Sequence, residues 1–76
     1  MDKKKALHYF KLAAEGGSAN AQCTLGHMYY QGNGVERDFV EARRLWELAA
    51  IQGHESAEKY LVMIGANAMI GANARR

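Results

Sequence analysis

The histidines and the single cysteine are the side chains of this 76-residue chain with the most scope for chemistry. The segment His54–Glu58 begins like the HExxH pattern of zinc proteases, but its fifth residue is glutamate. Zinc-dependent hydrolysis requires two histidines one helical turn apart and a further ligand. Cys23 and His27 also lie one turn apart, and no second pair of ligands has suitable spacing. We therefore expect no metal, no cofactor and no catalytic residues, with Cys23 as a free thiol on a helix.

Two further features invite a functional interpretation and favour a structural one. Gly32-Asn33-Gly34 lacks the preceding strand and the Gly-Lys-Ser/Thr ending of a phosphate-binding loop, so we predict a turn there. Trp46 could stack on a ligand. Because it shares a helical stripe with Ala42 and Ala49, we predict instead that it packs in the core.

The composition is typical of a small globular domain, with 49% hydrophobic and 24% charged residues and a net charge of +2. A single cysteine excludes an intrachain disulfide and fits a reducing compartment, so we expect a cytoplasmic protein. No run reaches the roughly 18 apolar residues of a membrane span. Because the short basic clusters lack interleaved aromatics, we expect neither nucleic-acid binding nor membrane insertion. These clusters are Lys3–Lys5, Arg43-Arg44 and Arg75-Arg76.

The dominant pattern is an internal repeat, which appears when the chain is compared with itself at a shift of 36 residues. Phe10 then falls on Trp46, an aromatic residue on an aromatic residue. The other matches are Asp2 with Asp38, Ala6 with Ala42, Leu12–Ala14 with Leu48–Ala50, Gly17 with Gly53, Ala21 with Ala57 and Leu25 with Leu61.

Each half of the repeat has the apolar spacing of an amphipathic helix. Ser18 and Asp38 are predicted N-caps, and Glu41 completes a capping box with Asp38. Glycines end the helices, because they adopt positive φ at low cost. We therefore predict helices over about 2–15, 18–31, 38–52 and from 54 to about 64. Apolar stripes on the middle two comprise Ala21, Leu25, Met28 and Tyr29, and Phe39, Ala42, Leu45, Trp46, Ala49 and Ala50.

These residues resemble the Sel-one-like repeat family. The resemblance lies in Ala21-x-x-x-Leu25-Gly26-x-x-Tyr29-x-x-Gly32-x-Gly34-Val35-x-x-Asp38 and its continuation Ala42-x-x-x-Trp46-x-x-Ala49-Ala50-x-x-Gly53. The 36-residue period and the Gly-x-Gly-Val loop favour this family over the related 34-residue tetratricopeptide repeat. The resemblance implies an all-α fold, an α/α superhelix (solenoid) of antiparallel helix pairs with about four helices here. It also implies an adaptor that assembles protein complexes.

The repeat divides the chain into one full unit flanked by partial ones. Residues 2–17 are predicted to be the second helix of a partial repeat, 18–53 a full repeat, and 54–66 the first helix of a following repeat. Val62 and Gly65 stand where the family pattern has glycine and tyrosine. The near-duplication Ile64–Arg75 follows, so we expect residues 67–76 to form a degenerate tail.

We therefore predict a non-catalytic protein–protein interaction module or scaffold. The alternatives are a small metal- or thiol-dependent protein using Cys23 and His27, or a fragment of a longer repeat protein. In helix-pair solenoids the first helix of each pair lines the concave side. The side opposite its predicted buried stripe should then be an exposed partner-binding strip of Cys23, His27, Tyr30, Lys59 and Met63.

The two ends of such an array are also expected to matter. An open solenoid end leaves an apolar face uncovered unless a polar capping repeat protects it. We therefore expect self-association through the open ends, seen either as concentration-dependent dimerisation or as low stability of the isolated monomer.

Overall fold

The computed structural model describes the backbone of residues 2–73 and the side chains of residues 2–65. This part of the chain forms four helices and no strand, which confirms the predicted all-α fold. The helices are α1 (Lys3–Glu15), α2 (Ala19–Gln31), α3 (Phe39–Ile51) and α4 (Glu55–Asn73).

The predicted N-caps are confirmed. The Ser18 side chain accepts a hydrogen bond from the Ala21 N–H at 3.2 Å, and the Asp38 side chain accepts one from the Glu41 N–H at 3.1 Å. The reciprocal half of the predicted capping box is wrong. The Asp38 N–H donates instead to the Tyr29 carbonyl at 2.9 Å, which ties the start of α3 to the end of α2.

Glycines in the left-handed region, Gly17, Gly32 and Gly53, follow α1, α2 and α3. Gly32 has φ of 73°, and its N–H donates to the Met28 carbonyl at the end of α2. Gly53, with φ of 85°, follows α3. A residue with a Cβ would be strained at any of these positions.

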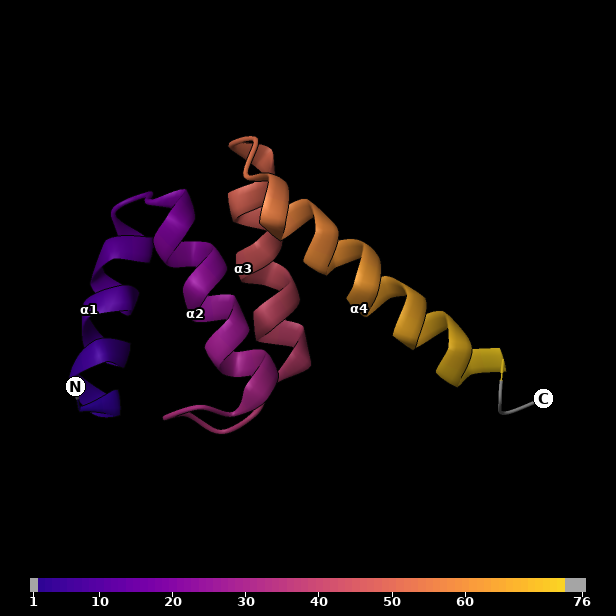
Figure 1. The fold of residues 1–76 in the computed structure, drawn as a ribbon, viewed down its shortest axis with the longest axis horizontal. Helices are drawn as coiled ribbons and strands as arrows, with labels where there is room; N and C mark the ends of the chain where they lie inside the picture. Colours follow the sequence, from indigo (N-terminus) through magenta and orange to yellow (C-terminus); the bar gives the residue numbers. More distant parts are fainter. Residues whose placement is uncertain (1, 74–76) are drawn as a thin grey trace.

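Successive helices are antiparallel and pack side by side (Figure 1). Helix α2 packs on both α1 and α3, and α3 packs on α4 as well. The last turns of α4 extend away from the other helices (Figure 1). We expected a tail from residue 67, but α4 continues to Asn73. A helical glycine costs about 1 kcal/mol relative to alanine, which is not enough by itself to end a helix. Residues 74–76 lie outside the described residues.

Trp46 is fully buried at the centre of the molecule, as predicted from its stripe. Its indole Nε1–H donates to the Cys23 carbonyl at 3.0 Å, and its ring lies 4.9 Å from that of Tyr60, centroid to centroid. The residues packed with Trp46, which we call the Trp46 cluster, come from α2, α3 and α4. Its buried members are Cys23, Ala42, Trp46, Ala49 and Ala57.

A second buried cluster joins α1 to the other side of α2, and Leu45 of α3 also packs into it. Its members are Ala14, Ala21, Leu25, Met28 and Leu45, with Leu7, Phe10, Ala13 and Tyr29 partly buried against it. Helix α2 thus has one apolar side toward α1 and another toward α3 and α4.

Candidate interaction surfaces

The predicted partner-binding strip is only partly exposed. Lys59 is exposed and Met63 is 37% exposed, whereas His27 and Tyr30 are half-buried. Cys23 is 7% exposed and belongs to the Trp46 cluster, so the expectation that it lies on the surface is wrong.

The physical reason is that α2 has packed neighbours on two sides. Its Ala21–Met28 stripe faces α1, and the opposite side was expected to face solvent. That side instead faces α3 and α4, where the Tyr30 ring packs against Phe39 and Trp46 with centroids 5.2 and 5.6 Å away. His27 similarly lies 5.5 Å from the ring of Tyr60 in α4. One helix considered alone does not reveal which of its sides a later helix covers.

Burial also decides the chemistry of Cys23. Removal from water raises the pKa of the Cys23 thiol, because burial disfavours the charged thiolate. We expect its reaction with Ellman's reagent at pH 8 to be at least about ten-fold slower in the folded chain than in denaturant. The measurement is the rate of thionitrobenzoate release, and equal rates would show that the thiol is accessible.

His54, which begins the HExxH-like segment, has a structural role. Its Nδ1 accepts the Ala57 N–H at 3.2 Å, which caps the N-terminus of α4. Its Nε2 lies 2.9 Å from Asn20 Oδ1, and this network assigns the proton to Nε2. Both ring nitrogens are therefore engaged, and the histidine links the starts of α2 and α4. Among the described residues, no group of three or more His, Cys, Asp or Glu side chains is placed to hold a metal ion.

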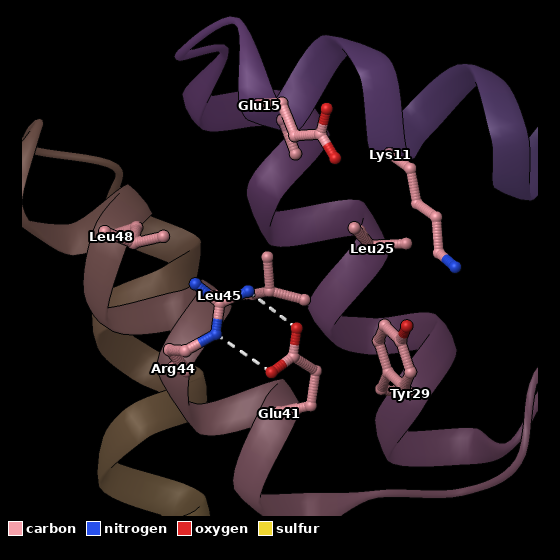
Figure 2. Close-up of a pocket in the computed structure, with 9 residues that line it drawn as sticks. Lys11, Glu15, Leu25, Tyr29, Glu41, Arg44, Leu45 and Leu48 are labelled. Atoms are coloured by element: carbon pink, nitrogen blue, oxygen red, sulfur yellow. Dashed lines mark hydrogen bonds and ion pairs between the residues drawn. The ribbon is translucent and has the colours of Figure 1, made fainter.

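A groove of about 300 Å³ lies between α1 and α3, over α2 (Figure 2). Buried apolar side chains from all three helices form its floor, and charged or polar side chains form its rim. The floor consists of Ala14, Leu25 and Leu45, with Leu48 at one side; the rim consists of Lys11, Glu15, Tyr29, Glu41 and Arg44. The groove can therefore hold an apolar group against its floor and polar groups at its edge.

The charged residues on the rim differ in whether they are paired. Arg44 donates two hydrogen bonds to the Glu41 carboxylate, at 2.9 and 2.6 Å (Figure 2). These hydrogen bonds are the main cause of the lowered pKa of Glu41. Burial of the carboxyl group opposes them by raising the pKa, and the positive charges of Arg44 and Lys11 lower it further. Lys11 and Glu15 form no ion pair with any side chain that the structure describes. The Lys11 ammonium is thus the cation on the rim that a ligand could pair with directly.

This groove was not among the sites predicted from the sequence. Lys11 and Glu15 border the apolar stripe of α1, and Glu41 and Arg44 border that of α3. The positions of these charged residues could have indicated the groove. In the repeat, the second helices α1 and α3 flank the first helix α2. Charged residues at the edges of the apolar stripes of α1 and α3 therefore mark the two sides of a groove over α2.

Comparison with known families settles what kind of array this is. The Sel1 repeat model matches residues 2–18 and 19–54. The chain belongs to the Sel1 repeat family. Sel1 repeats are helical repeats that generally mediate protein interactions, which agrees with the resemblance found in the sequence. The first match covers α1, and the second covers α2 and α3.

Three relatives contain a similar Sel1-repeat segment. DAP3-binding cell death enhancer 1 from Rattus norvegicus is 38% identical over 61 residues, 80% of this chain and 12% of the relative. The Mus musculus protein of the same name is 34% identical over 61 residues, with the same shares. Alginate biosynthesis protein AlgK from Azotobacter vinelandii is 38% identical over 64 residues, 84% of this chain and 14% of the relative. This chain therefore spans about an eighth of their lengths.

No solved structure gives a significant match to the chain. None of the helices described here is both long enough and apolar enough to cross a membrane.

Proposed function

We propose that this Sel1-repeat chain is a non-catalytic interaction module that binds a segment of a partner protein in the groove between α1 and α3. The observation that carries the proposal is the groove itself, with its apolar floor and the Lys11 ammonium on its rim. The family supports it, and one relative is named for binding another protein. The burial of Cys23 and the capping role of His54 favour binding over thiol or metal chemistry.

The dimensions and charges of the groove favour a particular kind of occupant. About 300 Å³ is at the lower end of ligand pockets, enough for one or two side chains of a peptide. A leucine- or methionine-sized side chain would lie over Leu25 and Leu45. A neighbouring carboxylate would pair with Lys11, because Arg44 is already held by Glu41. We therefore propose a partner segment with an apolar residue next to an acidic one.

Selection from a displayed library of random peptides tests this proposal. We expect enrichment of sequences that combine an apolar residue with a neighbouring Asp or Glu. Lys11→Glu should weaken an enriched peptide at least about ten-fold in fluorescence anisotropy, since it replaces attraction with repulsion. Lys59→Glu on α4 is the matched control, because it makes the same charge change away from the groove.

The two lysine variants also distinguish binding in the groove from binding at the surface that the sequence predicts. His27, Tyr30, Lys59 and Met63 stay a proposed alternative contact surface, with Cys23 acting only through the packing beneath them. If Lys59→Glu abolishes binding and Lys11→Glu does not, the partner binds that surface and the groove assignment is wrong. Cytoplasmic location stays part of the proposal, supported by the single cysteine.

A further inference from the structure

A shift of 36 residues along the sequence aligns each outer helix with the inner helix that has the same place in the repeat. Helix α1 is the counterpart of α3, and α4 is the counterpart of α2. Counterpart residues differ sharply in burial. Leu45 of α3 is 2% exposed, whereas its counterpart Tyr9 in α1 is 66% exposed. Gly26 of α2 is buried, whereas its counterpart Val62 in α4 is 73% exposed.

These differences have one geometric origin. In the central pair, Leu45 and Gly26 lie on the sides by which α3 and α2 cover each other. The first helices of the repeats are α2 and α4, and the second helices are α1 and α3. Helix α1 exposes the side that corresponds to the side of α3 packed on α2. Helix α4 exposes the side that corresponds to the side of α2 that α3 covers. Lys59 fits this reading, because its counterpart Cys23 is buried in the Trp46 cluster. The exposed part of the predicted strip therefore corresponds to a repeat-packing face that no helix of the described residues covers.

The two exposed faces are halves of the same interface, so one molecule can supply what another exposes. We propose that the α4 face of one molecule receives α1 of a second copy, as α2 receives α3 within the chain. Such a contact joins unlike faces, so it leaves one face of each kind free and adds molecules head to tail. It uses neither the groove nor Lys11, and so stands apart from partner binding in the groove.

The charges of the two helices favour this pairing over like with like. Apart from Lys11 and Glu15, which lie on the groove rim, α1 carries three lysines and no acidic residue, whereas α4 carries two glutamates and one lysine. Two α1 helices would repel each other, but α1 and α4 carry opposite net charge. The association should therefore weaken as salt is added.

We expect the contact between two copies to be weaker than the α2–α3 contact within one chain. Gly26 lets the Trp46 indole approach the α2 backbone, whereas Val62 and Phe10 stand at these positions in the proposed contact. The valine side chain holds the two helices further apart. Because a single helix–helix contact forms, we expect a dissociation constant on the order of 10–100 μM.

Single-face variants provide a sharp test by sedimentation velocity, with the 76-residue chain at about 10 μM to 1 mM. The wild-type protein should form dimers and larger species as concentration rises. Tyr9→Glu blocks the α1 face and Val62→Glu blocks the α4 face, so each variant alone should be monomeric. An equal mixture still has one open face of each kind, and should form a one-to-one dimer and nothing larger.

Ile51→Glu is the control, because Ile51 is 82% exposed and lies on neither face. It should associate as the wild type does. Circular dichroism checks that every variant remains helical, and Val62→Lys replaces Val62→Glu if the latter loses helix. A wild-type monomer at all concentrations would overturn the proposal. So would a single-face variant that still dimerises alone, a mixture that stays monomeric, or a loss of association in the Ile51→Glu control.

Discussion

Replacing Trp46 with alanine is expected to abolish folding of the chain. The indole is fully buried and contacts all three of α2, α3 and α4 through the Trp46 cluster. Emptying a buried aromatic position costs about 3–5 kcal/mol. A core of this size rarely supplies more than about 3–5 kcal/mol of stability in total. We expect the variant to lack the helical circular dichroism signal and the cooperative melting transition of the wild type.

Two companion variants show which property of Trp46 matters. Trp46→Phe keeps a ring but loses the hydrogen bond to the Cys23 carbonyl, so we expect a folded protein with a lower melting temperature. Tyr9→Ala also removes an aromatic ring, but from a 66% exposed site, and should change stability by no more than about 0.5 kcal/mol. A Trp46→Ala protein that melts like the wild type would show that the indole is not the centre of the core.

The features that the sequence predicted correctly depend on short stretches of chain or on the repeat. Ser18 and Asp38 cap helices because their side chains reach N–H groups three residues ahead. Gly32 ends α2 because it adopts a positive φ. Trp46 was placed in the core by its register with Phe10 and its neighbours on one stripe. Each of these inferences needs only one helix or a comparison of two.

The features that the sequence did not predict depend on how three helices meet. Cys23 and Tyr30 lie on the side of α2 opposite Leu25, and only the positions of α3 and α4 show that this side is covered. The groove depends on the distance between α1 and α3, which are not consecutive in the sequence. That separation is set by how closely each approaches α2, and hence by the size of the residues between them.

Gly26 lies at the tight contact between α2 and α3, and its replacement is the second variant with a large expected effect. A Cβ at this position would lie 2.6 Å from Trp46 Nε1, 2.8 Å from Trp46 Cδ1 and 3.1 Å from the Ala42 carbonyl oxygen. The indole is held by the ring of Tyr60 and by its hydrogen bond to α2, and the carbonyl is part of the α3 backbone. Neither neighbour can move aside without separating α2 from α3.

Gly26→Ala is therefore expected to destabilise the protein, although alanine is the better helix former. Alanine gains about 1 kcal/mol of helix propensity, but overpacking at a tight contact costs about 1–3 kcal/mol, and here two rigid neighbours must shift. We expect a net loss of about 1–2 kcal/mol, or roughly 4–15 °C in melting temperature for a domain of this size.

Gly65→Ala in α4 is the matched control, because a Cβ there meets nothing within 4 Å. It should raise the melting temperature through helix propensity alone, by up to about 1 kcal/mol of stability. The same chemical change is thus expected to have opposite signs at two helical glycines. If Gly26→Ala stabilised the chain as much as Gly65→Ala, α2 and α3 could not approach as closely as the structure places them. The close packing assigned to the Trp46 cluster would then be wrong.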